Sequence, residues 1–312
     1  MFCPILEKYC LNHEKESKAG AKPYDPLLLF KILILKEKYG LSDDQIEYQI
    51  CDRQSFKEFL GLTISDKVPD AKTIWAFREK LVKHNVSKKL FEEFNNLLKE
   101  KGLILKEGRI ADATFLEVPR QHNTREENEA IKQGKELWED KPNKKCQKDI
   151  DARWIKKGEE KHFGYKNHIV ICKVSKMISS FTVTPASVHD SKAIELLLNK
   201  NNSGQTFLAD NAYTGKPIEK ILKKLNMNSE ICEKGFRNNH LTEKQKLSNN
   251  IKSKMRARVG HSFSVIKNVI NGSSRKLIGI KRITEVISII NLIHNMTRYE
   301  QIIRLNLLPV KG

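Results

Sequence analysis

The feature that most constrains the fold of this chain is a change in the sequence pattern at Gly102. Before this residue, segment 25–100 has apolar residues at helical spacing, divided by glycines and by polar residues that cap helices. After it, short apolar runs alternate with helical segments and turns, as expected for a sheet covered by helices. The sequence therefore predicts an all-helical N-terminal unit and a larger unit built on a sheet.

The helical unit fits either a DNA-binding unit or a plain bundle. Residues 27–35 are almost all apolar and must form a buried helix. Gly40 predicts the end of that helix, and Ser42 with Gln45 three residues later predicts a capped start for the next one. Short consecutive helices joined by a capped turn occur both in helix-turn-helix DNA-binding units and in helical bundles. These residues leave the two interpretations open.

Two aspartates are candidate functional residues in the second unit. Asp112 lies in the predicted strand 108–118, where a carboxylate among apolar residues is costly unless it is paired or binds a metal. A surface-facing position at the edge of the sheet is the alternative. Asp210 ends the apolar run 206–209 just before a turn and a helix. Carboxylates at the carboxyl ends of strands point into the active crevice of an α/β sheet.

The order of the elements predicts the fold class. Strands are expected at 103–105, 108–118, 162–171, 178–184, 206–210 and 228–232, with helices at 190–198 and 216–225. We therefore predict an α+β/α/β protein, with a ribonuclease-H-like mixed sheet, flanking helices and the N-terminal all-helical domain. In this fold Asp112 and Asp210 are adjacent at the centre of the sheet. Two carboxylates there can share Mg²⁺ or Mn²⁺ ions that activate a hydroxyl for attack at phosphorus.

The predicted domain boundaries follow the composition of the chain. Residues 1–100 form the helical domain, 101–300 the sheet domain, and 301–312 a tail. Residues 120–160 are dense in charged side chains, and we interpret them as a solvated helix and loop inserted into the sheet domain.

Residues 244–284 form a basic run, with eleven Lys or Arg residues and no Asp or Glu. If the segment is helical, one of its faces holds Arg256, Gly260, Ser264 and Lys267. Together with a formal net charge of +19, the run predicts a surface that faces phosphates, although an ordinary basic enzyme is the alternative. The candidate DNA-contacting residues are Lys252, Lys254, Arg256, Arg258 and Lys267.

The same run resembles a known family. It is similar to the third catalytic block of the insertion-sequence DDE transposases, in the IS-five group of the IS-four-like class. The signature of that block is Tyr, two residues, Arg, three residues, Glu, six residues and Lys. Arg256 and Lys267 match its Arg and Lys, whereas Ser253 stands at the Tyr position and Gly260 at the Glu position. Further blocks resemble the family at 56–78, 111–114, 149–154, 163–168, 184–191 and 209–213.

The resemblance implies a function, partners and roles for individual residues. It implies Mg²⁺- or Mn²⁺-dependent cleavage and strand transfer on double-stranded DNA, at inverted repeats and at a target, by a homo-oligomer. Asp112 and Asp210 take the first two catalytic, metal-binding positions. Arg256 and Lys267 take DNA-positioning roles, and the helical domain binds the inverted repeats. Gly260 takes the place of the third acidic ligand and supplies no ligand.

This missing ligand leaves several interpretations open. Glu243 and His261 are possible substitutes, but Glu243 lacks the flanking pattern and His261 lies about 100° further round a helix. The chain can be an active transposase, a catalytically dead or regulatory DNA-binding relative, or a DDE-fold nuclease that cuts without joining. Lys166 and His168 are expected to be surface residues of a strand rather than catalytic groups.

The cysteines and the hydropathy pattern predict the compartment. The six cysteines include no Cys-x-x-Cys pair, which is typical of reduced thiols. No apolar run reaches 18 residues, and the N-terminus has no signal-peptide pattern. We expect a cytoplasmic, nucleoid-associated protein with no membrane segment.

Overall fold

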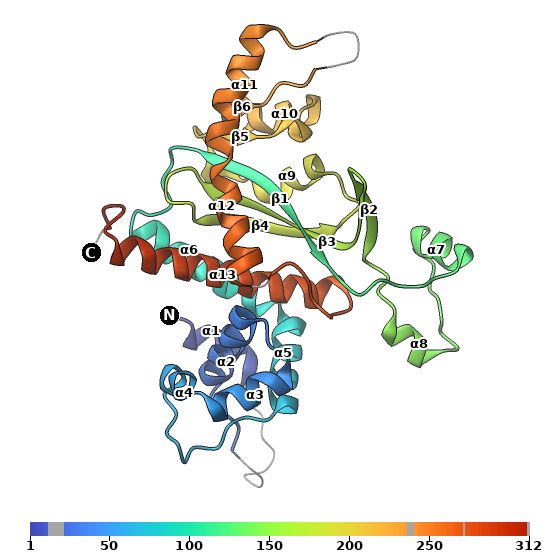
Figure 1. The fold of residues 1–312 in the computed structure, drawn as a ribbon, viewed down its shortest axis with the longest axis vertical. Coiled ribbons are helices and arrows are strands. Elements are labelled where there is room, and N and C mark those ends of the chain that lie inside the picture. Colours follow the sequence, from blue (N-terminus) through green and yellow to red (C-terminus); the bar gives the residue numbers. More distant parts are fainter. Residues whose placement is uncertain (12–21, 236–239, 271, 311–312) are drawn as a thin grey trace.

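The computed structural model describes residues 1–11, 22–235, 240–270 and 272–310. Helices come first along the chain and a mixed sheet with further helices follows (Figure 1). The N-terminal helices are α1 (Cys3–Cys10), α2 (Pro26–Tyr39), α3 (Asp43–Asp52), α4 (Gln54–Leu60), α5 (Ala71–His84) and α6 (Val86–Glu100).

Local capping chemistry sets the boundaries of these helices. The Asp25 side chain accepts a hydrogen bond from the Leu27 N–H at the start of α2, and Gly40 ends that helix at φ +65°. Ser42 and Gln45 form the predicted capping box of α3, each side chain bonding to the other residue's backbone N–H. The pattern of residues 1–24 did not predict α1.

In the described ranges the sheet has six strands, and the order of the main path is β2-β3-β1-β5-β6, with β4 also paired to β3. Strand β1 runs antiparallel to β3 and parallel to β5, β5 is parallel to β6, and β2 and β4 both run antiparallel to β3. The sheet is therefore mixed, as expected. The strands are β1 (Arg109–Glu117), β2 (Arg153–Lys157), β3 (Glu160–Cys172), β4 (Ile178–Pro185), β5 (Thr206–Ala209) and β6 (Asn228–Ile231).

The prediction of a strand at residues 103–105 is wrong. Gly102 adopts φ +71°, and the Leu103 N–H donates to the Leu98 carbonyl at 2.8 Å, so the chain closes the end of α6 there. Leu103 and Ile104 are buried without pairing as a strand. Their apolar run reflects burial in the core rather than membership of the sheet.

Two hydrophobic clusters cover the two faces of the sheet. The larger one joins the N-terminal helices, one sheet face and the long helix α13 (Ile280–Arg304), which passes between the helical unit and the sheet (Figure 1). This helix continues beyond the predicted start of a tail at residue 301 and buries Ile302. The smaller cluster packs α9 (Ile194–Leu197) and α10 (Lys216–Lys224) on the opposite face. Three 3₁₀ helices lie near them: η1 (Asp190–Ala193), η2 (Lys200–Asn202) and η3 (Asn211–Tyr213).

The charged segment after β1 forms a lobe with two helices, α7 (Arg125–Lys132) and α8 (Pro142–Gln147), as predicted in outline. It projects away from the sheet in Figure 1. The Glu127 carboxylate holds the lobe together because it accepts hydrogen bonds from Trp138 Nε1 at 2.9 Å and from Lys144 Nζ at 2.5 Å.

The basic run does not form one continuous α-helix. Helix α11 (Glu243–Arg256) ends at Ala257, α12 (Arg258–Ser264) follows it, and a π-helical turn, η4 (Val265–Val269), continues from α12. In Figure 1 α11 and α12 form one column beside the sheet, where α11 contacts β5 and α12 contacts β1. Within the described ranges, no helix combines the length and the apolar character needed to cross a membrane.

Candidate active site

Two parallel strands bring Asp112 and Asp210 to the same place. In the register of β1 and β5, Ile110 lies opposite Leu208, so two residues further along each chain Asp112 comes level with Asp210. Asp210 directly follows the last residue of β5 and caps η3, where its carboxylate accepts a hydrogen bond from the Ala212 N–H at 2.9 Å. Asp112 is therefore not a carboxylate on an outer edge of the sheet, since β1 is paired on both sides.

Arg256, at the end of α11, joins the two carboxylates. Its Nη1 atom lies 3.3 Å from Asp112 Oδ2 and 3.9 Å from Asp210 Oδ2. Because both oxygens are within 3.9 Å of one nitrogen, they lie at most about 7 Å apart. The three side chains are 23–34% exposed, so the cluster is open to solvent on one side.

Burial raises the pKa of the Asp112 carboxyl to about 6. A hydrogen bond from the Ala113 N–H at 2.8 Å and the charge of Arg256 both lower this pKa, whereas Asp210 and Asp190 raise it. Desolvation dominates this balance because the charged form loses water that two partners only partly replace. A cation beside Asp112 would offset this loss of water by stabilising the charged form.

The prediction that Lys166 and His168 are surface residues is wrong. Both are buried in β3, with exposures of 5% and 0%. Lys166 Nζ donates to Asp190 Oδ1 and to the Val188 carbonyl, both at 2.8 Å. His168 Nε2 lies 2.9 Å from Thr184 Oγ1, and burial lowers the His168 pKa to about 4. This part of β3 is covered on both faces, so alternation along the strand exposes neither residue.

Asp190 and Tyr213 belong to the surroundings of the carboxylates, although the sequence analysis gave them no role. The charge of Asp190 raises the pKa values of both Asp112 and Tyr213. Tyr213 is fully buried, and its hydroxyl has no hydrogen-bond partner among the described residues. Burial is the main cause that raises its pKa, ahead of the charges of the three aspartates. The signal for both residues was their position in the blocks 184–191 and 209–213.

Gly260 lies in α12 and faces open space. A Cβ added at this glycine would meet no atom within 4 Å. The two possible substitutes for the missing acidic ligand are both elsewhere. Glu243 is at the start of α11, about 20 Å from Arg256 at 1.5 Å per residue, and pairs with Lys246. His261 is an exposed residue, and its pKa is lowered first by partial burial of the ring and then by the charges of Lys176 and Arg298.

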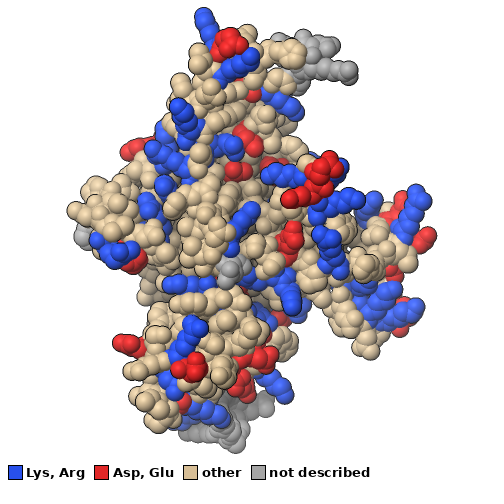
Figure 2. All heavy atoms as spheres, viewed as in Figure 1, with Lys and Arg blue, Asp and Glu red and all other residues tan. Residues whose placement is uncertain are grey.

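The other basic candidates lie along the α11–α12 column without contacting the carboxylates. Lys252 Nζ donates to the Ile231 carbonyl at 3.1 Å, and Arg258 Nη1 donates to the Lys173 carbonyl at 3.1 Å. Lys254 and Lys267 are exposed. Figure 2 shows basic side chains along this column on the visible face.

The cluster offers oxygen ligands of the kind that Mg²⁺ or Mn²⁺ prefers. One Mg²⁺ can be held by one or two carboxylates with water completing its octahedron, and Asp112 and Asp210 meet that requirement. No group of three His, Cys, Asp or Glu side chains placed for a metal occurs in the described part of the chain. The residues therefore fit one cation with two carboxylate ligands, and Gly260 supplies nothing for a second.

Comparisons with known proteins identify two matching families. A family model described as "Transposase DDE domain" matches residues 104–296, and one described as "Transposase domain (DUF772)" matches residues 4–80. Among solved structures, the chain is similar to one titled "Crystal structure of a pre-cleavage Mos1 transpososome", with a TM-score of 0.22 and 10% sequence identity. That similarity covers 95% of this chain and 82% of the other.

Proposed function

Because this chain belongs to the transposase DDE domain family, we propose that it is the transposase of an insertion sequence of the IS-five group. The observation that carries the proposal is the meeting of Asp112 and Asp210 on two parallel strands, with Arg256 between them. The family generally comprises enzymes that cut and join DNA. The sequence blocks around these residues resemble the IS-five group and supply the finer assignment.

In the proposed reaction, the side chains prepare a site for a phosphodiester of double-stranded DNA. When a divalent ion is bound, it lowers the pKa of an attacking water or 3′-hydroxyl and stabilises negative charge at phosphorus. Asp112 and Asp210 would hold that ion. Arg256 balances the two negative charges in the free protein, and its planar guanidinium is suited to grip a DNA phosphate once DNA arrives.

We expect the present chain, which has Gly260, to cleave DNA only weakly. Gly260 occupies the position of the third acidic ligand in the resembling block, so the site has two carboxylates for its cations. This feature favours a second candidate function, a DNA-binding relative of a transposase that no longer cuts. A DDE-fold nuclease can be distinguished from both by its products, because it cuts DNA without joining it.

DNA binding is assigned to the column of α11 and α12 and to the helical unit. Exchanging Lys254 and Lys267 for glutamate should weaken binding to duplex DNA and lower the slope of log K against log salt by about 0.9 for each lost phosphate contact. Lys220→Glu, on the exposed side of α10, is the matched control. If the slope stays unchanged, these lysines belong to a solvated face. We also propose that the protein acts as a homo-oligomer on its inverted repeats.

The decisive experiment uses a duplex that carries the inverted repeats flanking the gene, with Mg²⁺ or Mn²⁺. The Gly260→Glu protein should cleave and join this DNA, and adding Asp112→Asn or Asp210→Asn should abolish both products. Asp140→Asn, in the exposed lobe, should have no effect. Cleavage that survives both catalytic substitutions would refute the assignment of the carboxylates.

A further inference from the structure

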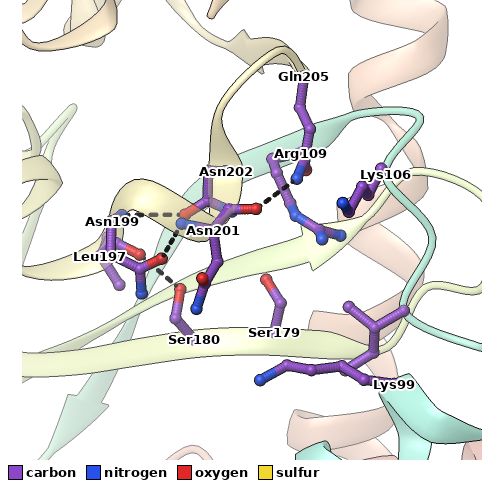
Figure 3. Close-up of a pocket in the computed structure, with 11 residues that line it drawn as sticks. Lys99, Lys106, Arg109, Ser179, Ser180, Leu197, Asn199, Asn201, Asn202 and Gln205 are labelled. Carbon is purple, nitrogen blue, oxygen red and sulfur yellow. Dashed lines mark hydrogen bonds between the residues drawn. The ribbon is translucent and has the colours of Figure 1, made fainter. Parts of the chain in front are cut away.

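A polar pocket lies at the amino ends of β1 and β5, away from the carboxylate cluster. Its volume is about 380 Å³, and residues of α6, β1, β4 and the segment before β5 line it (Figure 3). Gln205 in this pocket is five residues before Asp210, which is about 16 Å along an extended chain. The pocket therefore belongs to a different end of the sheet from the candidate active site.

Among the described residues, three cations and no carboxylate line this pocket. They are Lys99 from α6, Lys106 from the loop before β1, and Arg109, the first residue of β1. Figure 3 shows the Arg109 guanidinium and the Lys106 ammonium directed into the same space. In the ranges that the structure describes, none of the three forms an ion pair with Asp or Glu; Lys99 Nζ donates to Asn96 Oδ1 at 3.1 Å. The pocket therefore has an excess of positive charge.

Arg109 is the informative residue because its charge is buried. Its exposure is 4%, and its Nε and Nη1 atoms have no hydrogen-bond partner in the described chain. Burial lowers the pKa of the guanidinium, and the neighbouring Cys172 side chain, a thiol rather than a carboxylate, is what opposes this shift. A buried charge without a counter-charge is costly, and an anion in the adjacent pocket would compensate it.

The remaining lining groups indicate a ligand larger than a simple inorganic anion. Gln205 Oε1 is buried without a partner, while its Nε2 atom donates to the Asn201 carbonyl at 2.8 Å. An acceptor left open in this way is suited to a hydroxyl of a ligand. A second hollow of about 360 Å³ adjoins the first, because Lys99, Ser179 and Ser180 line both, and the aromatic rings of Phe91 and Phe181 border it. Together the two hollows can hold a ligand that joins a negatively charged group to an organic group.

We propose that this pocket binds a phosphate monoester, with the phosphoryl group on Arg109, Lys106 and Lys99 and the organic group in the adjoining hollow. A phosphate monoester carries nearly two negative charges at neutral pH and offers three acceptor oxygens, which matches a cluster of cationic donors. A free nucleotide and the 5′-phosphate end of a DNA strand share this chemistry. The site is separate from the cleavage proposed above and does not rest on it.

The test is calorimetric titration of the full chain with adenosine 5′-monophosphate, and with adenosine as the uncharged counterpart. We expect saturable binding of the monophosphate and at least tenfold weaker binding of adenosine. Lys106→Gln and Lys99→Gln should each weaken binding of the monophosphate at least fivefold. Both lysines are exposed, so these variants should keep the fold. Lys101→Gln near the pocket and Lys220→Gln on α10 are matched controls that should bind the monophosphate normally.

A second arm distinguishes the source of the phosphate. A short 5′-phosphorylated oligonucleotide is compared with its unphosphorylated form, in wild type and in Lys106→Gln. A preference for the phosphorylated strand that Lys106→Gln removes, without binding of the mononucleotide, assigns the site to a strand end and still supports it. The proposal is overturned if neither ligand binds saturably, if adenosine binds as tightly as its monophosphate, or if the lysine substitutions leave the affinities unchanged.

Discussion

At the scale of single residues, Arg256 neutralises two carboxylates that come from different strands. The distances of 3.3 and 3.9 Å from one Nη1 atom place its charge where a divalent ion bound by Asp112 and Asp210 would have to sit. A bound metal ion would therefore compete with the guanidinium for the same oxygens. In a free protein this arrangement keeps two acidic groups stable together, and it makes metal binding dependent on the movement of one side chain.

Removal of this competitor should strengthen metal binding. For Arg256→Gln we expect Mn²⁺ affinity, measured by electron paramagnetic resonance, to rise about fivefold, since a partly exposed ion pair contributes about 1 kcal/mol or less. Arg258→Gln is the control because Arg258 bonds to a backbone carbonyl instead. Weaker Mn²⁺ binding by Arg256→Gln would show that the guanidinium supports the metal site rather than opposing it.

Substitutions at Gly260 should affect the stability of the protein and its cleavage activity differently. Gly260→Ala and Gly260→Glu should both stabilise the protein by about 0.5–1 kcal/mol, because a helical glycine is unfavourable and the added Cβ meets no atom within 4 Å. Only the glutamate variant should gain Mg²⁺- or Mn²⁺-dependent cleavage of end-sequence DNA. Thermal unfolding measures the first effect, and a cleavage assay measures the second. Equal cleavage by both variants would rule out a ligand role for this position.

The sequence singles out Asp112, Asp210 and Arg256, which the structure brings together, but not the groups that surround them. Asp112 and Asp210 could be located because a carboxylate in an apolar strand, or at its end, departs from the local pattern. Lys166 and His168 could not, since their burial depends on helices and strands that pack on β3 from distant parts of the chain. The hydroxyl of Tyr213 gives no signal at all without its three-dimensional neighbours.

At the scale of the elements, an ion pair between β3 and the start of η1 joins the hairpin to the following helix. Lys166 Nζ and Asp190 Oδ1 lie 2.8 Å apart, with side-chain exposures of 6% and 24%. Loss of one partner leaves the other charge buried and uncompensated, which is more costly than loss of both. The pair therefore fixes the position of Asp190, whose charge raises the pKa of Asp112.

A double-mutant cycle at Lys166 and Asp190 tests whether the two charges depend on each other. Asp190→Ala should destabilise the protein by about 3 kcal/mol, and adding Lys166→Met should recover part of that loss. The exposed pair of Lys246 and Glu243 on α11 is the matched control, where the same kind of cycle should give less than about 0.5 kcal/mol. Denaturant unfolding measures both cycles. Additive effects at Lys166 and Asp190 would mean that the two charges do not depend on each other.

Elements were predictable where the signal was local. The capping box of α3 and the glycine at the end of α2 act within one helical turn, so the sequence determines them. The break between α11 and α12 lies in a uniform helical pattern and coincides with the change from packing on β5 to packing on β1. Residues 103–105 have the composition of a strand, but the two edges of β1 are already occupied by β3 and β5.

At the scale of the whole molecule, α13 connects the helical unit to the sheet. Its Asn295 side chain donates to Asn95 of α6 and accepts from the backbone N–H of Ile178 in β4, both at 2.8 Å. Its Glu285 side chain accepts a hydrogen bond from the Ser87 N–H at the start of α6. The two units thus share one helix and one hydrophobic cluster, and anything that destabilises α13 affects both.

A buried histidine in α13 makes the stability of the whole molecule depend on pH. His294 is 2% exposed, and burial lowers its pKa to about 4, with further lowering by His261 and Arg298. In the unfolded chain an ordinary histidine has a pKa of about 6.5, so between these values the unfolded state binds more protons than the folded state. Stability is therefore fully present above pH 6.5 and falls as the pH decreases toward 4.

The size of this effect at pH 5, relative to pH 7, is about 2 kcal/mol for one such histidine. We expect His294→Gln, which cannot take up the proton, to lose less stability than wild type over this interval. Denaturant unfolding at pH 5 and pH 7 measures the loss of stability for each protein. Subtracting one loss from the other removes the contribution of carboxylates that titrate equally in both proteins. His189→Gln is the control, because His189 is on the surface. If wild type and His294→Gln lose stability in parallel, acid acts on the protein through other groups.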